Sequence, residues 1–369
     1  TFSLLSIPFF MYAADIMSKG DIGHKLVNFA NRLVGHLPGG MAVAICIFAA
    51  FLGSISGSAT ACLAIIGTIF VPMMAASGYP RAFASGLAVT SAGLGAVIPP
   101  SVFMIIFGAS NRISIADLFA AGVGPGLLAA ALMCLLTVYL SIKRGYRGGE
   151  KASPAARLEA FRKAFPILLM PLIVLGGIYS GLLTATESSA IAVVWSFIAG
   201  MFIYRELKWS DLFDIFVDSA KSSAMTLFII ATSTAFAWLF AYAGISQKLV
   251  DFVIGMNLSA TMYCLVVAVI LLIFGTFLEG IATAVLLVPV LWPVAQALGV
   301  NVIHFGMIVS IANVVGTMTP PVAVNIFSAA SVTKLSMGKI VHGQWPFFIG
   351  YVGFFFLVVF IPALSTFLL

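Results

Sequence analysis

Long apolar segments separated by short polar breaks fill most of this chain. A helix needs about 20 apolar residues to span the hydrocarbon core of a bilayer, so the chain offers roughly ten crossings. Hydrophobic residues make up 62% of its 369 residues and charged residues 8%, against about 45–50% and 25% in soluble domains. We therefore predict an all-α polytopic membrane protein that has the lipid bilayer as a partner. A soluble enzyme, a disordered chain and a nucleic-acid binder are excluded.

The predicted apolar segments are 2–17, 38–53, 58–76, 80–98, 101–110, 117–142, 165–182, 186–204, 222–243, 261–275, 281–298, 302–316, 320–333 and 345–369.

Several of these segments are too short to cross a bilayer, and two pairs of them are separated by small polar residues. The segments 38–53 and 58–76 are separated by GSISGSA, and 261–275 and 281–298 are separated by GTFLEGIA. Short helices in tandem do not each span the core. We predict that each pair is a re-entrant helical hairpin.

Two other pairs are interrupted by two consecutive prolines. These are 80–98 with 101–110, and 302–316 with 320–333. Proline lacks a backbone N–H and breaks a helix. We therefore predict two crossings that are broken near the middle of the membrane.

The basic residues predict how the chain is oriented. The longest polar interruption, residues 141–164, carries seven basic and two acidic residues, and basic residues gather in cytoplasmic loops. If this loop is cytoplasmic and the hairpins do not cross, only Arg112 and Lys248 of the 18 basic residues lie outside. The C-terminus is then periplasmic.

Two stretches combine charge with apolar residues at helical spacing, at Lys19–Leu37 and Arg205–Ser223. We predict that both lie flat at the membrane interface. The alternative is an ordinary solvated helix in a loop.

The chain also repeats itself at an offset of 221–223 residues. The second copy has five predicted crossings, an odd number, so successive copies have opposite orientation. Inverted repeats with broken helices are typical of secondary transporters. Two crossings of the second copy have no partner in the first, so about 60 residues are expected to precede Thr1. The matched segments are Gly20–Phe29 with Ala243–Phe252, Gly57–Ala61 with Gly280–Ala284, and Gly95–Pro100 with Gly316–Pro321.

Several separated motifs together resemble one known family, the large membrane subunit of TRAP (tripartite ATP-independent periplasmic) transporters. They are, in order, LLSIPFFMYAADIM, GSISGSATA, AIIGTIFVPMM, GLGAVIPPS, GLLTATESSA and GTMTPPVAVN. The resemblance covers essentially the whole chain. It implies a sodium-driven elevator-type transporter in the bacterial inner membrane that imports C4-dicarboxylates, sialic acid or other organic acids. It implies two protein partners, a small four-helix membrane subunit and a soluble periplasmic substrate-binding protein.

The resemblance also implies a division into a transport domain and a scaffold. Residues 38–116 and 261–340 each supply one hairpin and one broken helix to the transport domain. The scaffold comprises 1–37 with an interfacial arm, 117–260 with the cytoplasmic loop and a second arm, and the C-terminal helix at 341–369.

Broken helices predict where sodium binds. A break frees main-chain carbonyls, which are hard oxygen ligands, and half-helix N-termini, which favour carboxylates. Each repeat supplies one hairpin tip and one break, so we predict two related Na⁺ sites with the substrate between them. The first site comprises Ser54, Ser56, Gly57, Gly95, Val97 and Pro99. The second comprises Gly275, Thr276, Gly280, Gly316, Thr317 and Thr319.

Hydroxyl and amide side chains near these tips are candidates for substrate contacts: Ser58, Thr60, Thr283 and Asn325. Glu279 lies in the second tip, where three roles are open: charge beside the second Na⁺ site, proton binding, or contact with water. For Glu187 the alternatives are an N-terminal cap and an ion pair within the scaffold or with a partner.

Other functions have less support in the sequence. It contains no G-x-x-x-x-G-K-[ST] motif for ATP, no H-E-x-x-H and no G-x-S-x-G, so we predict that the protein is not an enzyme. An ion channel or a non-transport membrane scaffold remains the alternative, since a channel would also use carbonyl sites.

Overall fold

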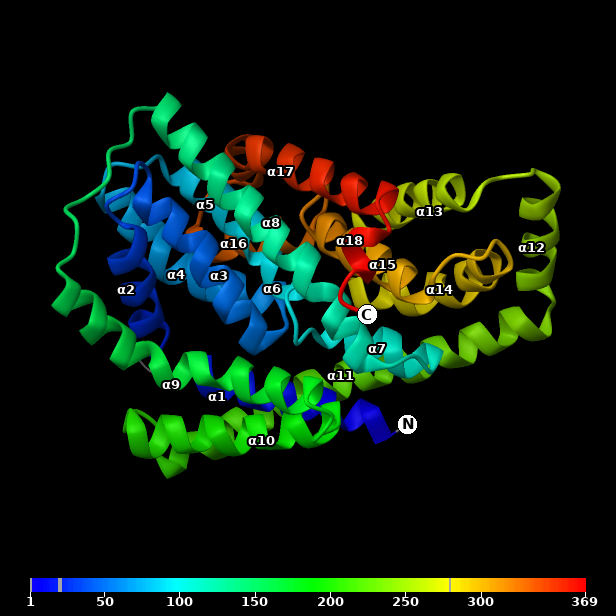
Figure 1. Cartoon of the computed structure of the whole chain (residues 1–369), viewed down its shortest axis with the longest axis horizontal. Coiled ribbons are helices and arrows are strands. Elements are labelled where there is room, and N and C mark those ends of the chain that lie inside the picture. Colours follow the sequence, from blue (N-terminus) through cyan, green and yellow to red (C-terminus); the bar gives the residue numbers. More distant parts are fainter. Residues whose placement is uncertain (1, 19–21, 279) are drawn as a thin grey trace.

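The computed structural model describes residues 2–18, 22–278 and 280–369 (Figure 1). Within these ranges the chain forms helices and no strand. Seven of the described helices are long and apolar enough to cross a membrane, or eight when one bent pair is taken as a single span. The prediction of an all-α polytopic membrane protein is confirmed.

The helices are, in chain order, η1 (Phe2–Leu5), α1 (Ser6–Ser18), α2 (Ile22–Val34), α3 (Gly40–Ser56), α4 (Ala59–Ala76), α5 (Arg81–Ala92), α6 (Leu94–Val97), α7 (Val102–Asn111), α8 (Ile115–Lys143), α9 (Pro154–Tyr179), α10 (Ala185–Ile198), the π-helix η2 (Ala199–Ile203), α11 (Trp209–Tyr242), α12 (Ile245–Gly255), α13 (Ala260–Gly275), α14 (Gly280–Ala297), α15 (Val302–Thr317), α16 (Val324–Thr333), α17 (Met337–Phe360) and α18 (Ala363–Thr366).

Both predicted helical hairpins form, from α3 with α4 and from α13 with α14. In the first, Gly57 has φ 60°, a left-handed conformation that glycine adopts without steric cost. Gly57 is the C-cap residue of α3, and its N–H donates to the carbonyl of Gly53 at 2.7 Å. Ser58 then accepts a hydrogen bond from the N–H of Ala61 at 3.5 Å and starts α4. The direction of the chain therefore reverses within two residues.

Both predicted breaks form as well, at Ile98–Ser101 and at Met318–Ala323. The helices on either side of the first break are bent by 40°. The Pro-Pro peptide bond is cis in both breaks. Each break is the point where helical hydrogen bonding stops inside an apolar segment.

Three predicted boundaries were wrong. The stretch Arg205–Ser223 is not a separate helix, since α11 runs unbroken from Trp209 to Tyr242 with no glycine or proline between its polar and apolar halves. Helix α9 begins at Pro154, inside the predicted loop, because Ser153 caps it. The last predicted crossing, 345–369, starts at Met337 and ends at Phe360, before Pro362.

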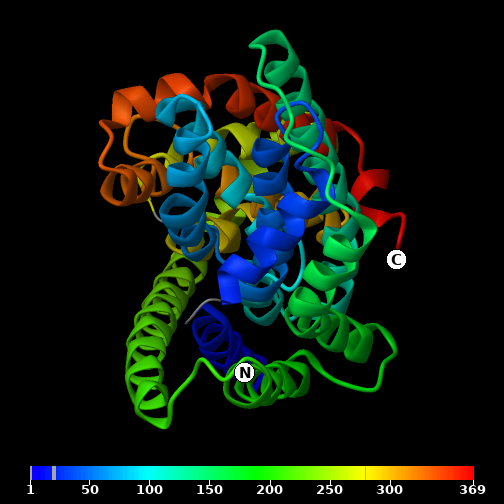
Figure 2. The ribbon, with the colours of Figure 1, turned by 90° about the vertical axis from the view of Figure 1, so that its left-hand side faces the viewer.

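The helices form two groups. Helices α1, α9, α10 and α11 form one, here called the side layer, in which α1 packs on α10 and α11, and α10 packs on α9. The other, here called the hairpin body, contains α3–α8 and α13–α17. Figures 1 and 2 show α1, α9 and α10 along one edge, with the hairpin body beside them. Helices α8 and α17 pack on hairpin and broken-helix elements.

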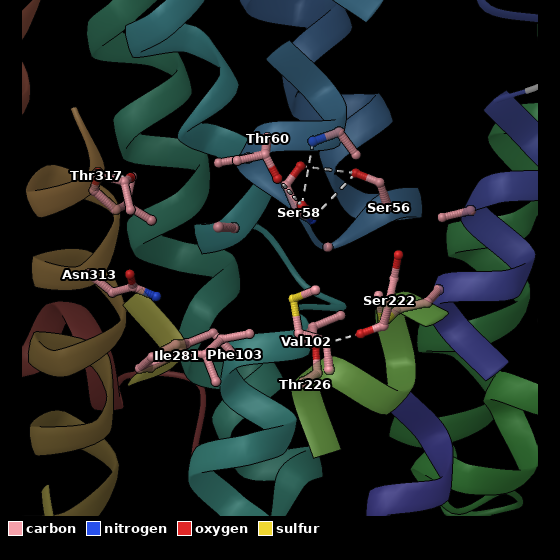
Figure 3. A pocket seen from close by; sticks show the side chains of 18 of the residues that line it. Ser56, Ser58, Thr60, Val102, Phe103, Ser222, Thr226, Ile281, Asn313 and Thr317 are labelled. Carbon is pink, nitrogen blue, oxygen red and sulfur yellow. Dashed lines mark hydrogen bonds between the residues drawn. The ribbon is translucent and has the colours of Figure 1, made fainter. Parts of the chain in front are cut away.

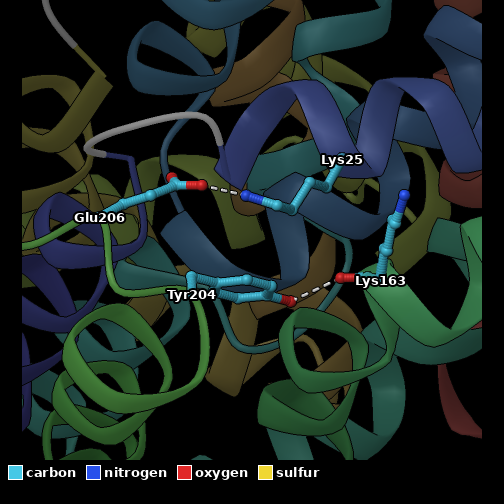
Figure 4. Close-up of polar contacts among 4 residues, drawn as sticks. All are labelled: Lys25, Lys163, Tyr204 and Glu206. Carbon is cyan, nitrogen blue, oxygen red and sulfur yellow. Dashed lines mark hydrogen bonds and ion pairs between the residues drawn. The ribbon is translucent and has the colours of Figure 1, made fainter.

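Helix α2 connects the two groups and is held by polar contacts (Figure 4). Lys25 forms an ion pair with Glu206, in the segment before α11. Its ammonium group also lies 4.7 Å from the ring centroid of Tyr204. The Tyr204 hydroxyl donates to the carbonyl of Lys163 on α9 at 2.8 Å. These contacts join α2 to the side layer, while its other face packs on α3.

One of the two acidic residues singled out from the sequence is explained by the fold. Glu187 forms a capping box at the start of α10, accepting from the N–H of Thr184 at 2.8 Å while its own N–H donates to the Thr184 hydroxyl at 3.2 Å. The capping alternative is confirmed. Glu279 lies outside the described residues.

Candidate functional site

The first hairpin meets the first break at two glycines in direct backbone contact. A Cβ placed on Gly53 would lie 1.9 Å from the Cα of Gly95, and one placed on Gly95 would lie 2.7 Å from the Cα of Gly53. No side chain larger than hydrogen fits there without moving the backbone. The close approach brings the end of α3 onto α6.

The second repeat builds the same contact. A Cβ on Gly275 would lie 2.9 Å from the Cα of Gly316, and one on Gly316 would lie 2.7 Å from the Cα of Gly275. Gly275 follows Gly53 by 222 residues and Gly316 follows Gly95 by 221, which is the repeat offset. Three of these four glycines were predicted as site residues, and Gly53 was not.

The contact between a hairpin tip and a break is here called a junction. At the first junction, the serine hydroxyls of the predicted sodium site donate to nearby main-chain carbonyls. Ser54 donates to the carbonyl of Phe51 at 2.7 Å, and Ser56 donates to the carbonyl of Ser58 at 3.3 Å. A Cβ on Gly57 would lie 3.1 Å from the carbonyl oxygen of Pro100. The tip of the hairpin therefore faces main-chain atoms of the first break, and the carbonyl oxygen of Pro100 is one of them.

The other two residues of the predicted first site, Val97 and Pro99, lie beside α8. A Cβ on Gly122 would lie 3.1 Å from the carbonyl oxygen of Val97 and 3.2 Å from the ring of Pro99. Pro100, whose carbonyl borders Gly57, was not predicted, because the sequence does not show which way each freed carbonyl points.

At the second junction the hairpin and the break are joined by a hydrogen bond. The N–H of Ala323 donates to the carbonyl of Thr276 at 3.2 Å. Thr317 and Thr319 donate their hydroxyls to the carbonyls of Val314 and Val315, at 2.8 and 2.6 Å. As at the first junction, the hydroxyls bond to carbonyls of their own chain segment.

Gly280, predicted for the second site, lies against Asn313 of α15. A Cβ on Gly280 would lie 1.3 Å from the Asn313 Oδ1 position. Asn313 was not predicted as a site residue.

The two breaks differ in one respect. The carbonyl of Met318 accepts a hydrogen bond from the buried Gln344 amide of α17 at 2.6 Å. Its counterpart by the repeat offset is Val97, 221 residues earlier and the last residue of α6, whose carbonyl lies beside Gly122 of α8 instead. At the second break a side-chain amide therefore donates a hydrogen bond to the carbonyl. At the first break a glycine lies beside the equivalent carbonyl.

A cavity of about 640 Å³ lies between the first hairpin tip, both breaks and the side layer (Figure 3). Ser58, Thr60 and Asn325, predicted as substrate contacts, all line it. The Ser58 and Thr60 hydroxyls are 3.0 Å apart. Asn325 is buried and donates to the Thr317 hydroxyl at 3.2 Å. Thr283, the fourth predicted residue, is buried on α14 and does not line the cavity.

The side layer contributes lining residues that sequence reasoning did not assign to the site. Asp15 comes from α1, and Lys221, Ser222 and Thr226 come from α11. A signal for Lys221 was present: it is the last charged residue of α11, followed by an uncharged stretch at 222–242. The wrong boundary at Arg205–Ser223 placed it on a separate interfacial helix.

The chain matches one protein family over residues 1–364. That family is described as the DctM component of tripartite ATP-independent periplasmic transporters. This chain belongs to the DctM family. It is therefore a multi-pass membrane component of a three-part transport system and not an enzyme.

Curated relatives agree with this assignment. The C4-dicarboxylate TRAP transporter large permease proteins DctM of Rhodobacter capsulatus and Pseudomonas aeruginosa are 34% and 36% identical to this chain. The matches cover 99% of this chain and 86% and 85% of those proteins. The isethionate TRAP transporter permease protein DctMQ of Oleidesulfovibrio alaskensis is 33% identical over 100% of this chain and 58% of that protein.

The fold also resembles a solved structure, the YdaH transporter of Alcanivorax borkumensis. The TM-score is 0.62, with 13% sequence identity, over 97% of this chain and 84% of that one. At this identity the likeness concerns the fold alone.

Proposed function

We propose that this chain imports a small organic anion across the bacterial inner membrane together with sodium ions. The observation that supports this most is the convergence of four helix N-termini on one cavity, since the first turns of α4, α7, α14 and α16 all contribute lining residues. Helix N-termini carry partial positive charge and unpaired N–H groups, which favour carboxylates. Ser101, the N-cap residue of α7, donates its hydroxyl to the Ala96 carbonyl at 2.8 Å and does not cap the helix.

Sodium binds, in this proposal, at the two junctions between hairpin tip and break. Both junctions combine a backbone-to-backbone glycine contact with carbonyls released from helical hydrogen bonding. Such carbonyls are the ligand type that unwound membrane helices offer to Na⁺. Bound cations would also reduce the repulsion between an anionic substrate and the carbonyl-rich breaks.

Transport follows an elevator mechanism in this proposal. The cavity has one wall from the hairpin body and one from the side layer, so sliding one group past the other would carry the substrate across the membrane. Helices α8 and α17 belong to the hairpin body because they pack on its hairpin and broken-helix elements. We propose that they move with it, although sequence reasoning assigned both to the scaffold. Helix α2, in contact with both groups, would act as the connecting arm.

The names of the relatives support a substrate class. Their names specify C4-dicarboxylates, isethionate, 2,3-diketo-L-gulonate and ectoine, all small molecules with at least one acidic group. We propose a substrate of this kind, with sialic acid as a further candidate. A periplasmic binding protein would deliver it, and a small four-helix membrane subunit would complete the complex. The loop around residues 144–153 would face the cytoplasm and the C-terminus the periplasm.

Uptake into proteoliposomes tests this function. The chain, reconstituted with its small subunit and binding protein, is given succinate, isethionate, 2,3-diketo-L-gulonate, ectoine and sialic acid as separate labelled probes. We expect accumulation of at least one probe with an inward Na⁺ gradient and without ATP. Replacing external Na⁺ with K⁺ should reduce uptake to background. Accumulation that persists without a Na⁺ gradient, or that requires ATP, would contradict the proposal.

A further inference from the structure

Lys221 is the one lysine or arginine among the described residues that line the cavity. It is the thirteenth of the 34 residues of α11, which places it about 18 Å from the start of the helix at 1.5 Å per residue. The uncharged stretch 222–242 that follows is about 32 Å long and matches the thickness of the hydrocarbon core. Lys221 therefore lies where α11 enters the apolar region. Charged residues at such depths normally face a water-filled cavity or a partner.

The neighbours of Lys221 leave its ammonium group available. Its ion-pair partner in the structure is Asp218, one turn earlier, at 3.5 Å between Nζ and Oδ1. Both side chains are largely exposed, at 72% and 75%, and exposed pairs of this kind contribute little to stability. Asp15 of α1 lines the same cavity. A ligand carboxylate can thus take the place of Asp218 beside Lys221 at small cost.

We infer that Lys221 binds one carboxylate of the substrate and makes the cavity selective for carboxylates. This inference rests on the proposed import of an organic anion. It adds a charged contact from the side layer to the contacts offered by hydroxyls and helix N-termini of the hairpin body. The substrate would then touch both groups of helices in the conformation described here, with Lys221 at the end of the cavity where α11 enters the apolar region.

Binding of succinate to the purified membrane complex tests the inference. Lys221→Gln should weaken succinate binding about tenfold, the low end for losing a charge-assisted hydrogen bond because the side chain is exposed. Lys221→Arg should stay within about threefold of the unchanged protein. Lys248→Gln, on α12 and away from the cavity, is the matched control and should have no effect.

A comparison of two ligands separates direct contact from a structural role. Succinamate has one carboxylate of succinate replaced by an amide. The unchanged protein should prefer succinate, and Lys221→Gln should lose most of that preference. If Lys221→Gln weakens both ligands equally, or if Asp218→Asn weakens succinate binding as much as Lys221→Gln does, the ion pair has a structural role and the inference is wrong.

A cysteine variant keeps the test informative if Lys221→Gln folds poorly. Lys221→Cys can be modified in the folded protein with aminoethyl methanethiosulfonate, which restores an ammonium group, or with the sulfonatoethyl reagent, which adds a negative charge. The first should restore succinate binding and the second should abolish it. Equal effects of both reagents would overturn the inference. If the unchanged complex takes up no organic anion at all, the proposed function fails instead.

Discussion

Gly53→Ala is expected to reduce substrate uptake at least about tenfold, because the new methyl group would overpack the contact between hairpin and break. The added Cβ would lie 1.9 Å from the Cα of Gly95, whereas non-bonded carbons stay about 3.5–4.0 Å apart. The hairpin tip would have to move by roughly 2 Å, which displaces the carbonyls proposed to bind Na⁺. The measurement is the initial rate of Na⁺-driven uptake in proteoliposomes, together with the melting temperature.

Gly353→Ala is the matched control for this prediction. Gly353 lies in α17, and apart from the nearby backbone of its own helix nothing lies within 4 Å of a Cβ placed on it, so uptake and melting temperature should stay unchanged. Gly316→Ala should behave like Gly53→Ala, since its Cβ would lie 2.7 Å from the Cα of Gly275. Normal uptake by Gly53→Ala would show that the close approach has no part in transport.

A covalent link between the hairpin body and the side layer is expected to stop uptake completely. Val102 and Thr226 line the same cavity from α7 and α11 (Figure 3). With cysteines at both positions, bifunctional methanethiosulfonate reagents of increasing length should bridge them. A sliding body cannot move while the bridge holds, so uptake should fall to background and return when the bridge is reduced.

A bridge within the side layer is the control for this experiment. Ser223 on α11 donates to the sulfur of Met11 on α1 at 3.6 Å, and a cysteine pair at these positions joins two helices of the same layer. Bridging them should leave uptake largely intact. The unchanged protein, treated with the same reagents, controls for its four free cysteines. Undiminished uptake by the bridged Val102–Thr226 protein would contradict an elevator mechanism.

Local sequence patterns predicted the elements of this fold well. Small polar residues between short apolar segments marked both hairpins, and the two Pro-Pro pairs marked both breaks, because glycine and proline act on the backbone at their own positions. The repeat also matched Gly316 at the second break to Gly95 at the first. It also matched the sequence of α12 to that of α2.

What the sequence left open depends on tertiary packing. The carbonyl of Val97 lies beside Gly122 of α8, whereas the carbonyl of Pro100 lies beside Gly57 of the hairpin, and this difference between neighbouring carbonyls is set by packing that the sequence does not show. Lys221 lies in the cavity wall because α11 continues without a break from its charged half into its apolar half. The charges alone had favoured a separate interfacial helix. Thr283 does not line the cavity because it lies on the buried face of α14, and the sequence does not show which face that is.

Equilibrium binding of ²²Na⁺ to the purified chain tests the central claim, that each junction of hairpin tip and break holds a cation. We expect saturable binding of two ions per chain, with K⁺ a poor competitor. Gly53→Ala and Gly316→Ala should each lose one ion, while Gly353→Ala should keep both. No saturable Na⁺ binding, or full binding by both glycine variants, would contradict it.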